Sequence, residues 1–292
     1  MVQQTDKMDE KNIKKMNPTT FARLYSIFNA KRWHDKEMHE VVFSNFCELL
    51  GNLNEKQQNL ILELAERYTW LTFAEYQGKL VHIFNNIIPN EEIINLEKII
   101  LFPVMKPSDE EKTKSGHGVL IILRGVRPFF TKYSHLVFHE IETFDKLELP
   151  FHLNDNERIF LLDDFLGTGE TIKSTIEQIL LNPNITLDKI RVITVASHIQ
   201  AVNYMDSIGV KYYTEIVTRK EISDHYTSPE LEEKTTIMKE IERLLPSKKY
   251  SFGYGQSEGL ITLYRTPNNT FPIFWHDYEK NEVKYKAPFP RY

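Results

Sequence analysis

The sequence predicts an α/β protein with a doubly wound, mainly parallel sheet, an N-terminal helical region and a small C-terminal hood or cap. Short, continuously apolar runs are typical of strands that are buried on both faces of a parallel sheet. Such runs occur at residues 158–164, 189–198 and 210–218. Helical stretches at 171–181 and 200–207 alternate with them, which favours right-handed crossovers. Residues 20–96 contain very few Pro or Gly and carry apolar residues at helical spacing.

The changes in composition along the chain predict four consecutive parts. We expect a disordered arm at residues 1–17, a helical region at 18–100, the α/β core at 101–225 and a C-terminal cap at 226–292. The run "VLIILRG" at 119–125 is interpreted as one more buried strand. The aromatic side chains of the helical region are expected to be packing residues. They are Trp33, Phe43, Phe46, Tyr68, Trp70, Phe73, Tyr76 and Phe84.

Composition excludes several classes of protein. The formal net charge of -5 argues against broad, sequence-independent nucleic-acid binding, which needs an excess of Lys and Arg. The single cysteine, Cys47, cannot form an internal disulfide, which agrees with a reducing compartment. No apolar run approaches the roughly 18 to 20 residues of a membrane helix, and the N-terminus has no hydrophobic signal core. We therefore expect a cytoplasmic protein without a membrane partner.

The stretch "RIFLLDDFLGTGET", residues 158–171, carries the strongest chemical signal. In an open α/β sheet, ligands bind outside the carboxyl ends of the strands, where Asp163 and Asp164 are expected. The loop that follows brings backbone N–H groups to the start of a helix, where they favour an anion. Glycines in this loop permit positive φ and threonines supply hydroxyl donors: Gly167, Gly169, Thr168 and Thr171. The stretch therefore predicts a phosphate cradle beside two carboxylates.

Two other nucleotide sites fit this stretch poorly. A Walker loop needs a lysine before its Ser or Thr, and Glu170 stands in that place. A dinucleotide fingerprint needs a third glycine, which "GTGETI" lacks, and the preceding carboxylates would repel a pyrophosphate. A sugar-phosphate site remains, in which the loop holds a 5′-phosphate and the carboxylates accept hydrogen bonds from ribose hydroxyls.

Residues 159–171 resemble, without a gap, the ribose-phosphate-binding motif of the type I phosphoribosyltransferases. The resemblance implies that Asp163 and Asp164 hold the ribose hydroxyls and support an oxocarbenium-like transition state, the catalytic role. A carboxylate near a developing ribosyl cation stabilises it electrostatically. The resemblance also assigns the 5′-phosphate loop to Leu166, Gly167, Thr168, Gly169, Glu170 and Thr171.

Upstream, "LIILRGV" resembles the pyrophosphate loop of the same family. The resemblance implies that Arg124 helps to hold the pyrophosphate, that Gly125 allows a tight turn and that Arg127 is a second contact. The implied substrate is 5-phosphoribosyl 1-pyrophosphate or a nucleotide. The implied cofactor is Mg²⁺, which bridges the pyrophosphate and the ribose hydroxyls without a direct protein ligand.

The sequence departs from the family pattern in two places. The candidate lid over the site, residues 143–157, is short, and Gly167 stands where purine-specific members place a third acid, so purine salvage is poorly supported. The base-binding residues are also unassigned by the motifs. The candidates are His198, Tyr254, Gln256, Asn268, Asn269 and Trp275. Their alternative roles are a strand-end histidine bonded to the backbone and a loop held by Asx turns and aromatic packing.

The order of a helical region, this core and an ending "TPNNTFPIFW" resembles the phosphoribosyltransferase-like effectors of bacterial conflict systems, including retron-associated anti-phage systems. That resemblance covers most of residues 20–280. It implies a toxin-like or regulated enzyme with a nucleotide or nucleic-acid target. It also implies protein partners that hold the enzyme in check, in a homo-oligomer or a larger complex.

Three hypotheses of function follow. The first is an enzyme, a magnesium-dependent phosphoribosyltransferase of nucleotide metabolism or antiviral defence, which the acid pair and Arg124 favour. The second is a non-catalytic sensor of a ribose phosphate or nucleotide, which the short lid and the missing third acid favour. The third, a scaffold that merely retains the fold, is disfavoured by the presence of both Asp163 and Asp164.

Overall fold

The computed structural model describes residues 16–291, and the contacts among them define two compact units. The first unit comprises the described residues up to Thr72 together with those from Arg219 onward, and the second spans Phe73–Thr218. The terminal segments on either side of the second unit share one core. In the part of the chain that the structure describes, no helix is long and apolar enough to cross a membrane.

The first unit combines N-terminal helices with the C-terminal segment. Its elements are α2 (Pro18–Ala30), η1 (Trp33–Asp35), α3 (His39–Gly51), α4 (Glu55–Arg67), β1 (Thr69–Trp70), α9 (Glu230–Ile241), η8 (Glu242–Leu244), η9 (Tyr254–Gln256), β7 (Ile261–Thr262), η10 (Pro272–Phe274), β8 (Tyr278–Lys280) and β9 (Val283–Tyr285). Asn17 caps α2 by accepting a hydrogen bond from the backbone N–H of Thr19. Of the expected arm at 1–17, only Met16 and Asn17 lie within the described residues, and Met16 is buried in the core.

An aromatic cluster fills the core of the first unit. The rings of Tyr68 and Phe289 stack with centroids 4.7 Å apart, and Trp33 packs edge-on against both. The strand β1 pairs in parallel with β7, which lies almost two hundred residues later in the chain. The packing role predicted for the aromatic residues of this region is therefore confirmed for Trp33 and Tyr68.

The second unit is built on a five-stranded parallel sheet with the strand order β3-β2-β4-β5-β6. Its elements are α5 (Phe73–His82), the π-helix η2 (Ile83–Ile87), η3 (Asn90–Glu92), β2 (Lys98–Pro103), η4 (Pro107–Asp109), α6 (Ser115–Val126), η5 (Arg127–Phe129), β3 (Val137–Glu140), η6 (Phe144–Leu147), β4 (Glu157–Leu166), α7 (Glu170–Ile179), η7 (Leu187–Lys189), β5 (Ile190–His198), α8 (Ile199–Ile208) and β6 (Lys211–Thr218). The predicted fold class, a doubly wound parallel sheet, is confirmed.

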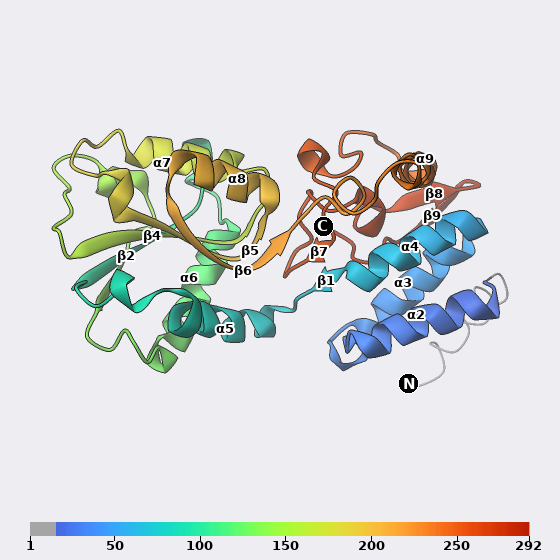
Figure 1. Ribbon diagram of the computed structural model, residues 1–292, viewed down its shortest axis with the longest axis horizontal. Coiled ribbons are helices and arrows are strands. Elements are labelled where there is room, and N and C mark those ends of the chain that lie inside the picture. Colours follow the sequence, from blue (N-terminus) through green and yellow to red (C-terminus); the bar gives the residue numbers. More distant parts are fainter. Residues whose placement is uncertain (1–15, 292) are drawn as a thin grey trace. The chain divides into compact units, whose positions relative to one another are not determined.

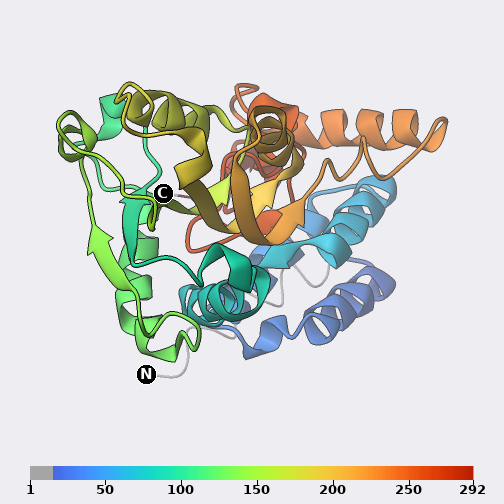
Figure 2. The same cartoon turned by 60° about the vertical axis from the view of Figure 1, so that its left-hand side comes forward.

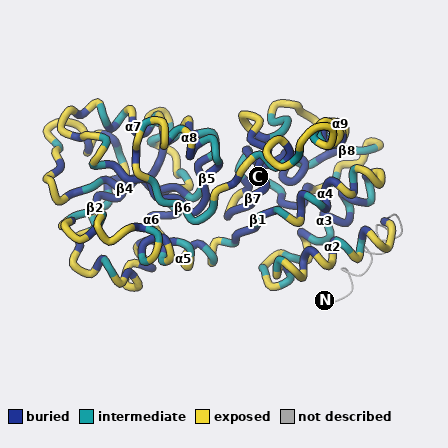
Figure 3. The backbone as a smooth tube through the Cα atoms, viewed as in Figure 1, coloured by how far each residue is buried: buried dark blue, intermediate teal, exposed yellow. Residues whose placement is uncertain are grey.

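Helices cover both faces of this sheet. The helices α5 and α6 lie on one face, and α7 and α8 lie on the other (Figures 1 and 2). The central strands are buried along almost their whole length (Figure 3), because apolar side chains point to both faces. The three strands predicted at 158–164, 189–198 and 210–218 correspond to β4, β5 and β6.

The strand predicted at 119–125 is wrong, because these residues form the second half of α6. Most of its apolar side chains are buried against the sheet, whereas Ile121 is 63% exposed, as expected on the outer face of a helix. The strand that precedes this helix is β2. The helix approaches the sheet closely at Gly116, where an added Cβ would lie 2.6 Å from the carbonyl oxygen of Leu162.

Candidate functional site

The order of the strands places a crevice between the carboxyl ends of β2 and β4. From β2 the chain continues to β3 on one side of it, and from β4 it continues to β5 and β6 on the other side. Ligands of doubly wound proteins bind where the strand order reverses in this way. The loop after β2 and the loop after β4 flank this point, and each leads into a helix, α6 and α7 respectively.

The aspartate pair lies at this position, near the carboxyl end of β4. Asp163 is buried, with 6% of its surface exposed, and Asp164 is half-buried. The hydroxyl of Ser115, the first residue of α6, donates to Asp163 Oδ1 over 2.5 Å, and the backbone N–H of Asp164 donates to the same oxygen over 2.9 Å. The hydroxyl of Tyr76 on α5 donates to Asp164 Oδ2 over 3.1 Å. Hydroxyl groups from two helices therefore hold the pair.

Burial makes ionisation of this pair unfavourable. It raises the pKa of Asp163 well above its usual value, and the charge of the adjacent Asp164 raises it further. Burial also raises the pKa of Asp164, and the hydrogen bond from Tyr76 opposes this effect. Among the residues that the structure describes, neither carboxylate forms an ion pair. The hydroxyl and amide donors are therefore the groups that favour the charged state.

The loop after β4 has the geometry of an anion cradle. Gly169 adopts φ = 90° and stands at the N-cap of α7, and as a glycine it has no side chain that could cap the helix. Gly167 does not have a positive φ, so of the two glycines only Gly169 has the role predicted for both. The carboxylate of Glu170 lies 3.7 Å from Lys106 Nζ, so a cation offsets its charge beside the cradle.

The loop after β2 is held by hydrogen bonds to β4 and to α7. The backbone N–H of Val104 donates to the carbonyl oxygen of Leu162 over 2.9 Å. The hydroxyl of Thr175 on α7 donates to the carbonyl oxygen of Met105 over 2.8 Å and lies 3.2 Å from the Met105 nitrogen. Lys106 follows directly and reaches the start of α7. This loop, rather than the segment around Arg124, faces the phosphate cradle.

The structure places the predicted pyrophosphate residues at the other end of α6. Arg124 lies nine residues after Ser115, which corresponds to about 14 Å along the helix axis. Its guanidinium pairs with Glu140 at the end of β3. Gly125 is helical and needs no positive φ, and Arg127 donates to the carbonyl oxygen of Leu136 while its guanidinium lies over the Phe138 ring. The prediction assumes a strand that ends at Arg124, and these residues are helical, so the pyrophosphate role of Arg124 stays a prediction without that support.

The candidate base-binding residues are held by local hydrogen bonds. His198 is fully buried, and its Nδ1 accepts a hydrogen bond from the backbone N–H of Gln200 at the start of α8. The other five candidates belong to the first unit. There the carbonyl oxygen of Asn268 accepts a hydrogen bond from the Tyr254 backbone N–H, and the Asn269 side chain donates to the Tyr254 carbonyl oxygen. Trp275 Nε1 donates to the carbonyl oxygen of Thr270, and Gln256 is exposed. These contacts match the alternative of a loop held by turns and packing.

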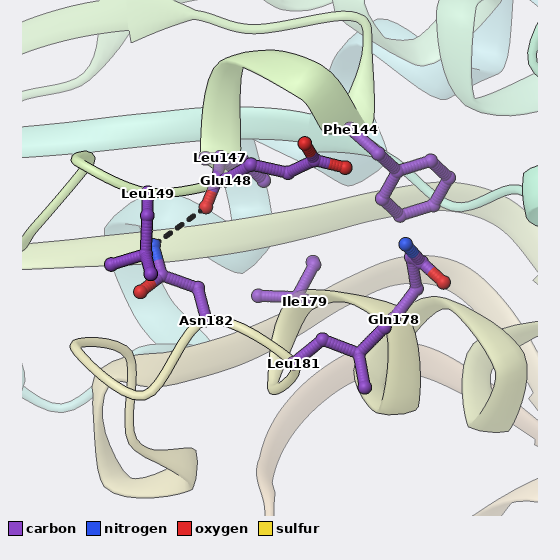
Figure 4. A pocket seen from close by; sticks show the side chains of 8 residues that line it. All are labelled: Phe144, Leu147, Glu148, Leu149, Gln178, Ile179, Leu181 and Asn182. Carbon is purple, nitrogen blue, oxygen red and sulfur yellow. Dashed lines mark hydrogen bonds between the residues drawn. The ribbon is translucent and has the colours of Figure 1, made fainter.

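The expected lid is a packed part of the second unit. Phe144, Leu147 and Leu153 are buried in the core formed with α7 and α8. Phe144 and Leu147, together with the end of α7, border a cavity of about 270 Å³. Asn182, which also lines this cavity, donates a hydrogen bond to the carbonyl oxygen of Leu147 (Figure 4). The helix α7 begins at the phosphate loop and ends at this cavity, so the cavity lies apart from the aspartate pair.

With this geometry established, comparison with known proteins identifies the family. The model of the PRTase-CE family matches residues 8–291. The chain belongs to the PRTase-CE family. The match includes the terminal segments as well as the parallel sheet, so both units belong to the family's common sequence. No curated protein matches the chain.

Solved structures similar to this PRTase-CE protein include three phosphoribosyltransferases. The orotate enzyme from Aeropyrum pernix has 11% identity and a TM-score of 0.29, and the match covers 49% of this chain and 71% of the other. The purine enzyme from Pyrococcus horikoshii Ot3 has 14% identity and a TM-score of 0.28, with 51% and 91% covered. The hypoxanthine-guanine enzyme from Schistosoma mansoni, in complex with IMP, has 17% identity and a TM-score of 0.28, with 49% and 65% covered.

Three residues at the PRTase-CE site have no counterpart in the sequence prediction. Ser115 and Tyr76 contact the aspartate pair, and Lys106 bridges the two loops. A usable signal existed only for Lys106, because it follows "KIILFPVM", an apolar run that precedes the polar linker. Ser115 and Tyr76 are 48 and 88 residues away from their partners, so no local pattern connects them.

Proposed function

We propose that this PRTase-CE protein is a phosphoribosyl-transfer enzyme that binds 5-phosphoribosyl 1-pyrophosphate in the crevice between β2 and β4. The observation that carries the proposal is the aspartate pair at the switch point, with Asp163 buried, beside the start of α7, whose N-cap is a glycine. The pair accepts the ribose 2′- and 3′-hydroxyls, and the 166–171 loop holds the 5′-phosphate. The ionised carboxylates stabilise positive charge that develops on the ribose ring.

The loop after β2 takes the role that the sequence assigns to Arg124. Lys106 Nζ lies 3.7 Å from Glu170 at the start of α7, so an incoming phosphate group would replace that carboxylate as its partner. The half-exposed side chain of Lys106 can make this exchange without unfolding the loop. We propose that residues 104–114 hold the pyrophosphate.

The donor set fits a magnesium ion that is shared with the substrate. Among the described residues no cluster of three or more His, Cys, Asp or Glu side chains could hold a metal ion by itself. Asp163 and Asp164 would hold the ion indirectly, through the ribose hydroxyls that they bind, and the oxygen atoms of the substrate suit Mg²⁺ as ligands. When bound, Mg²⁺ neutralises part of the pyrophosphate charge.

Thermal unfolding with and without 5-phosphoribosyl 1-pyrophosphate and Mg²⁺ tests this proposal. We expect the ligand to raise the melting temperature, and Asp164→Asn or Thr171→Ala to abolish the shift. Ser174→Ala, on the same helix as Thr171, is the matched control and should keep it. The proposal would be wrong if the native protein showed no shift at ligand concentrations up to the millimolar range.

Pyrophosphate release then distinguishes an enzyme from a sensor. We expect release when the protein, Mg²⁺ and 5-phosphoribosyl 1-pyrophosphate meet a suitable acceptor from a panel of bases, nucleotides and nucleic acids. Binding without release, with every acceptor and with water, would favour the non-catalytic sensor. The base-binding role of Tyr254, Gln256, Asn268, Asn269, Trp275 and His198 stays a prediction that the same panel tests.

The effector role forms the second part of the proposal, supported by the sequence resemblance to effectors of bacterial conflict systems. A toxin-like enzyme should stop growth when it is expressed without its partners in a bacterial host. We expect growth arrest with the native protein and normal growth with Asp164→Asn at equal expression. Equal growth of both strains would contradict the effector role and leave the enzyme proposal intact.

A further inference from the structure

The two hydroxyl groups at the aspartate pair come from outside the sequence motif. Ser115 begins α6 and Tyr76 lies on α5, and their oxygens contact different carboxylates, Asp163 and Asp164 respectively. Tyr76 is 2% exposed, so its ring is fixed by packing and its hydroxyl has little freedom to turn away. Ser115 is fixed by the close packing of the next residue, Gly116, on β2 and β4.

We propose that Ser115 and Tyr76 are positioning residues of the site: their hydroxyls fix the orientation of Asp163 and Asp164 for binding of the ribose hydroxyls. This inference rests on the proposed function of the aspartate pair. The sequence motif covers only the end of β4 and the loop after it, and the inference adds the hydroxyl groups of Ser115 on α6 and Tyr76 on α5.

The arrangement leaves defined oxygens for a ligand. The Ser115 hydroxyl and the Asp164 backbone N–H occupy Asp163 Oδ1, and the Tyr76 hydroxyl occupies Asp164 Oδ2. One oxygen of each carboxylate therefore remains to accept a ribose hydroxyl, and the occupied oxygen fixes the rotation of each group. A freely turning carboxylate would lose conformational entropy on binding, and the pre-oriented pair loses less.

The surroundings of the pair supply few other charges. The register partner of Asp163 on β5 is Thr194, which does not titrate. The loop after β2 carries Lys106, which pairs with Glu170 of α7, and Lys114, which precedes Ser115 and pairs with Asp109. Among the described residues neither carboxylate forms an ion pair, and the two hydroxyls donate hydrogen bonds to them. Against the effect of burial, the Ser115 hydrogen bond lowers the pKa of Asp163 and the Tyr76 hydrogen bond lowers the pKa of Asp164.

The matched variants are Tyr76→Phe and Ser115→Ala, which remove one hydroxyl each. We expect each to raise the dissociation constant for 5-phosphoribosyl 1-pyrophosphate with Mg²⁺ about tenfold or more, as typical for a lost hydrogen bond to a charged group. We also expect the acid side of the pH profile of binding to move to higher pH. Ser115→Thr keeps a hydroxyl and should restore native affinity within about threefold.

Tyr133→Phe is the control for Tyr76→Phe. Both tyrosines are 2% exposed and lie in the second unit, but the Tyr133 hydroxyl has no hydrogen-bond partner among the described residues. Its removal should leave affinity and pH profile unchanged. Native affinity and an unshifted pH profile in both Tyr76→Phe and Ser115→Ala would overturn the inference and leave the proposed function standing.

A measurement without ligand keeps the inference testable if the native protein does not bind 5-phosphoribosyl 1-pyrophosphate. Loss of the Tyr76 hydroxyl raises the pKa of Asp164 further above its unfolded value, so the loss of stability grows as the pH rises. We expect Tyr76→Phe to lower the free energy of unfolding more at pH 8 than at pH 4. In an Asp164→Asn background this pH dependence should disappear. The inference would be overturned if Tyr76→Phe lowered the free energy of unfolding equally at both pH values. It would also be overturned if the pH dependence of this loss persisted in the Asp164→Asn background.

Discussion

Replacement of Asp163 by asparagine should make the protein more stable at neutral pH. Asp163 is 6% exposed, forms no ion pair among the described residues and has the second carboxylate directly beside it. Asparagine has the same shape, and its side-chain oxygen can accept the bonds from Ser115 and from the Asp164 backbone. The substitution therefore removes a buried charge without removing its hydrogen bonds.

The size and the pH dependence of the gain follow from the burial. A buried polar group with incomplete compensation costs about 1–3 kcal/mol, so we expect a gain of this order at pH 7.5. Because the folded pKa of Asp163 is raised, the native state binds more protons than the unfolded state, and stability is lost as the pH rises from the ordinary pKa near 4 toward the folded pKa. Below pH 4 both states are protonated, and native protein and variant should converge.

Thermal and urea unfolding at pH 4 and pH 7.5 measure this effect. For a domain of about 150–250 residues, 1 kcal/mol corresponds to roughly 2–4 °C in melting temperature. Asp145→Asn, at an exposed position of η6, is the control and should show no such dependence. If Asp163→Asn were less stable than the native protein by the same amount at both pH values, the carboxylate would be a structural group and the reasoning would be refuted.

Two further predictions concern the elements around the pair. Gly116→Ala should destabilise the protein by about 1–3 kcal/mol in urea unfolding and weaken ligand binding, because the added Cβ would lie 2.6 Å from the Leu162 carbonyl oxygen. Gly118→Ala, on the same helix, is the control: its Cβ would meet nothing within 4 Å, so this variant should be neutral or stabilising. Lys106→Gln should raise the dissociation constant for 5-phosphoribosyl 1-pyrophosphate about tenfold, and Arg124→Gln should leave it unchanged. Equal effects of Lys106→Gln and Arg124→Gln on the dissociation constant would contradict the placement of the pyrophosphate in the loop after β2.

The motif could be predicted because its parts are adjacent in the chain. A strand, a short loop and a helix start follow one another between residues 158 and 171, and each has its own local signal. Gly169 has the positive φ that the pattern predicts. The parallel order of β4, β5 and β6 follows from the same local alternation of strands and helices.

The helix α6 could not be predicted because its sequence carries contradictory signals. Its first turn contains Gly116 and Gly118, which are poor helix formers, and its second half is a run of apolar residues that also suits a buried strand. The structure shows why a glycine fits at 116: the helix approaches β2 and β4 closely there, next to Ser115, which contacts the pair. The predicted strand at 119–125 ends near Arg124, and this is why the predicted pyrophosphate contact was placed at that residue.

Tyr76 shows a different limit of sequence analysis. Its packing role was predicted, and its ring is indeed buried. The hydroxyl that the ring carries contacts Asp164, and this contact depends on how α5 crosses the sheet, which no neighbouring residue encodes. The same holds for the shared core of the terminal segments, where β1 pairs with β7.

The cost of the aspartate pair and its proposed function have one physical origin. In the unliganded chain, two hydroxyls and backbone N–H groups donate hydrogen bonds to the two adjacent carboxylates and lower their pKa values. Burial has the larger effect, so the pKa of each carboxylate is still raised. Ribose hydroxyls that donate to the remaining oxygens would add interactions that favour the ionised form and lower these pKa values. The free energy that ionisation costs in the free protein is thereby recovered in the complex. Asp163→Asn should therefore gain stability and lose affinity together, because both effects come from the same buried charge.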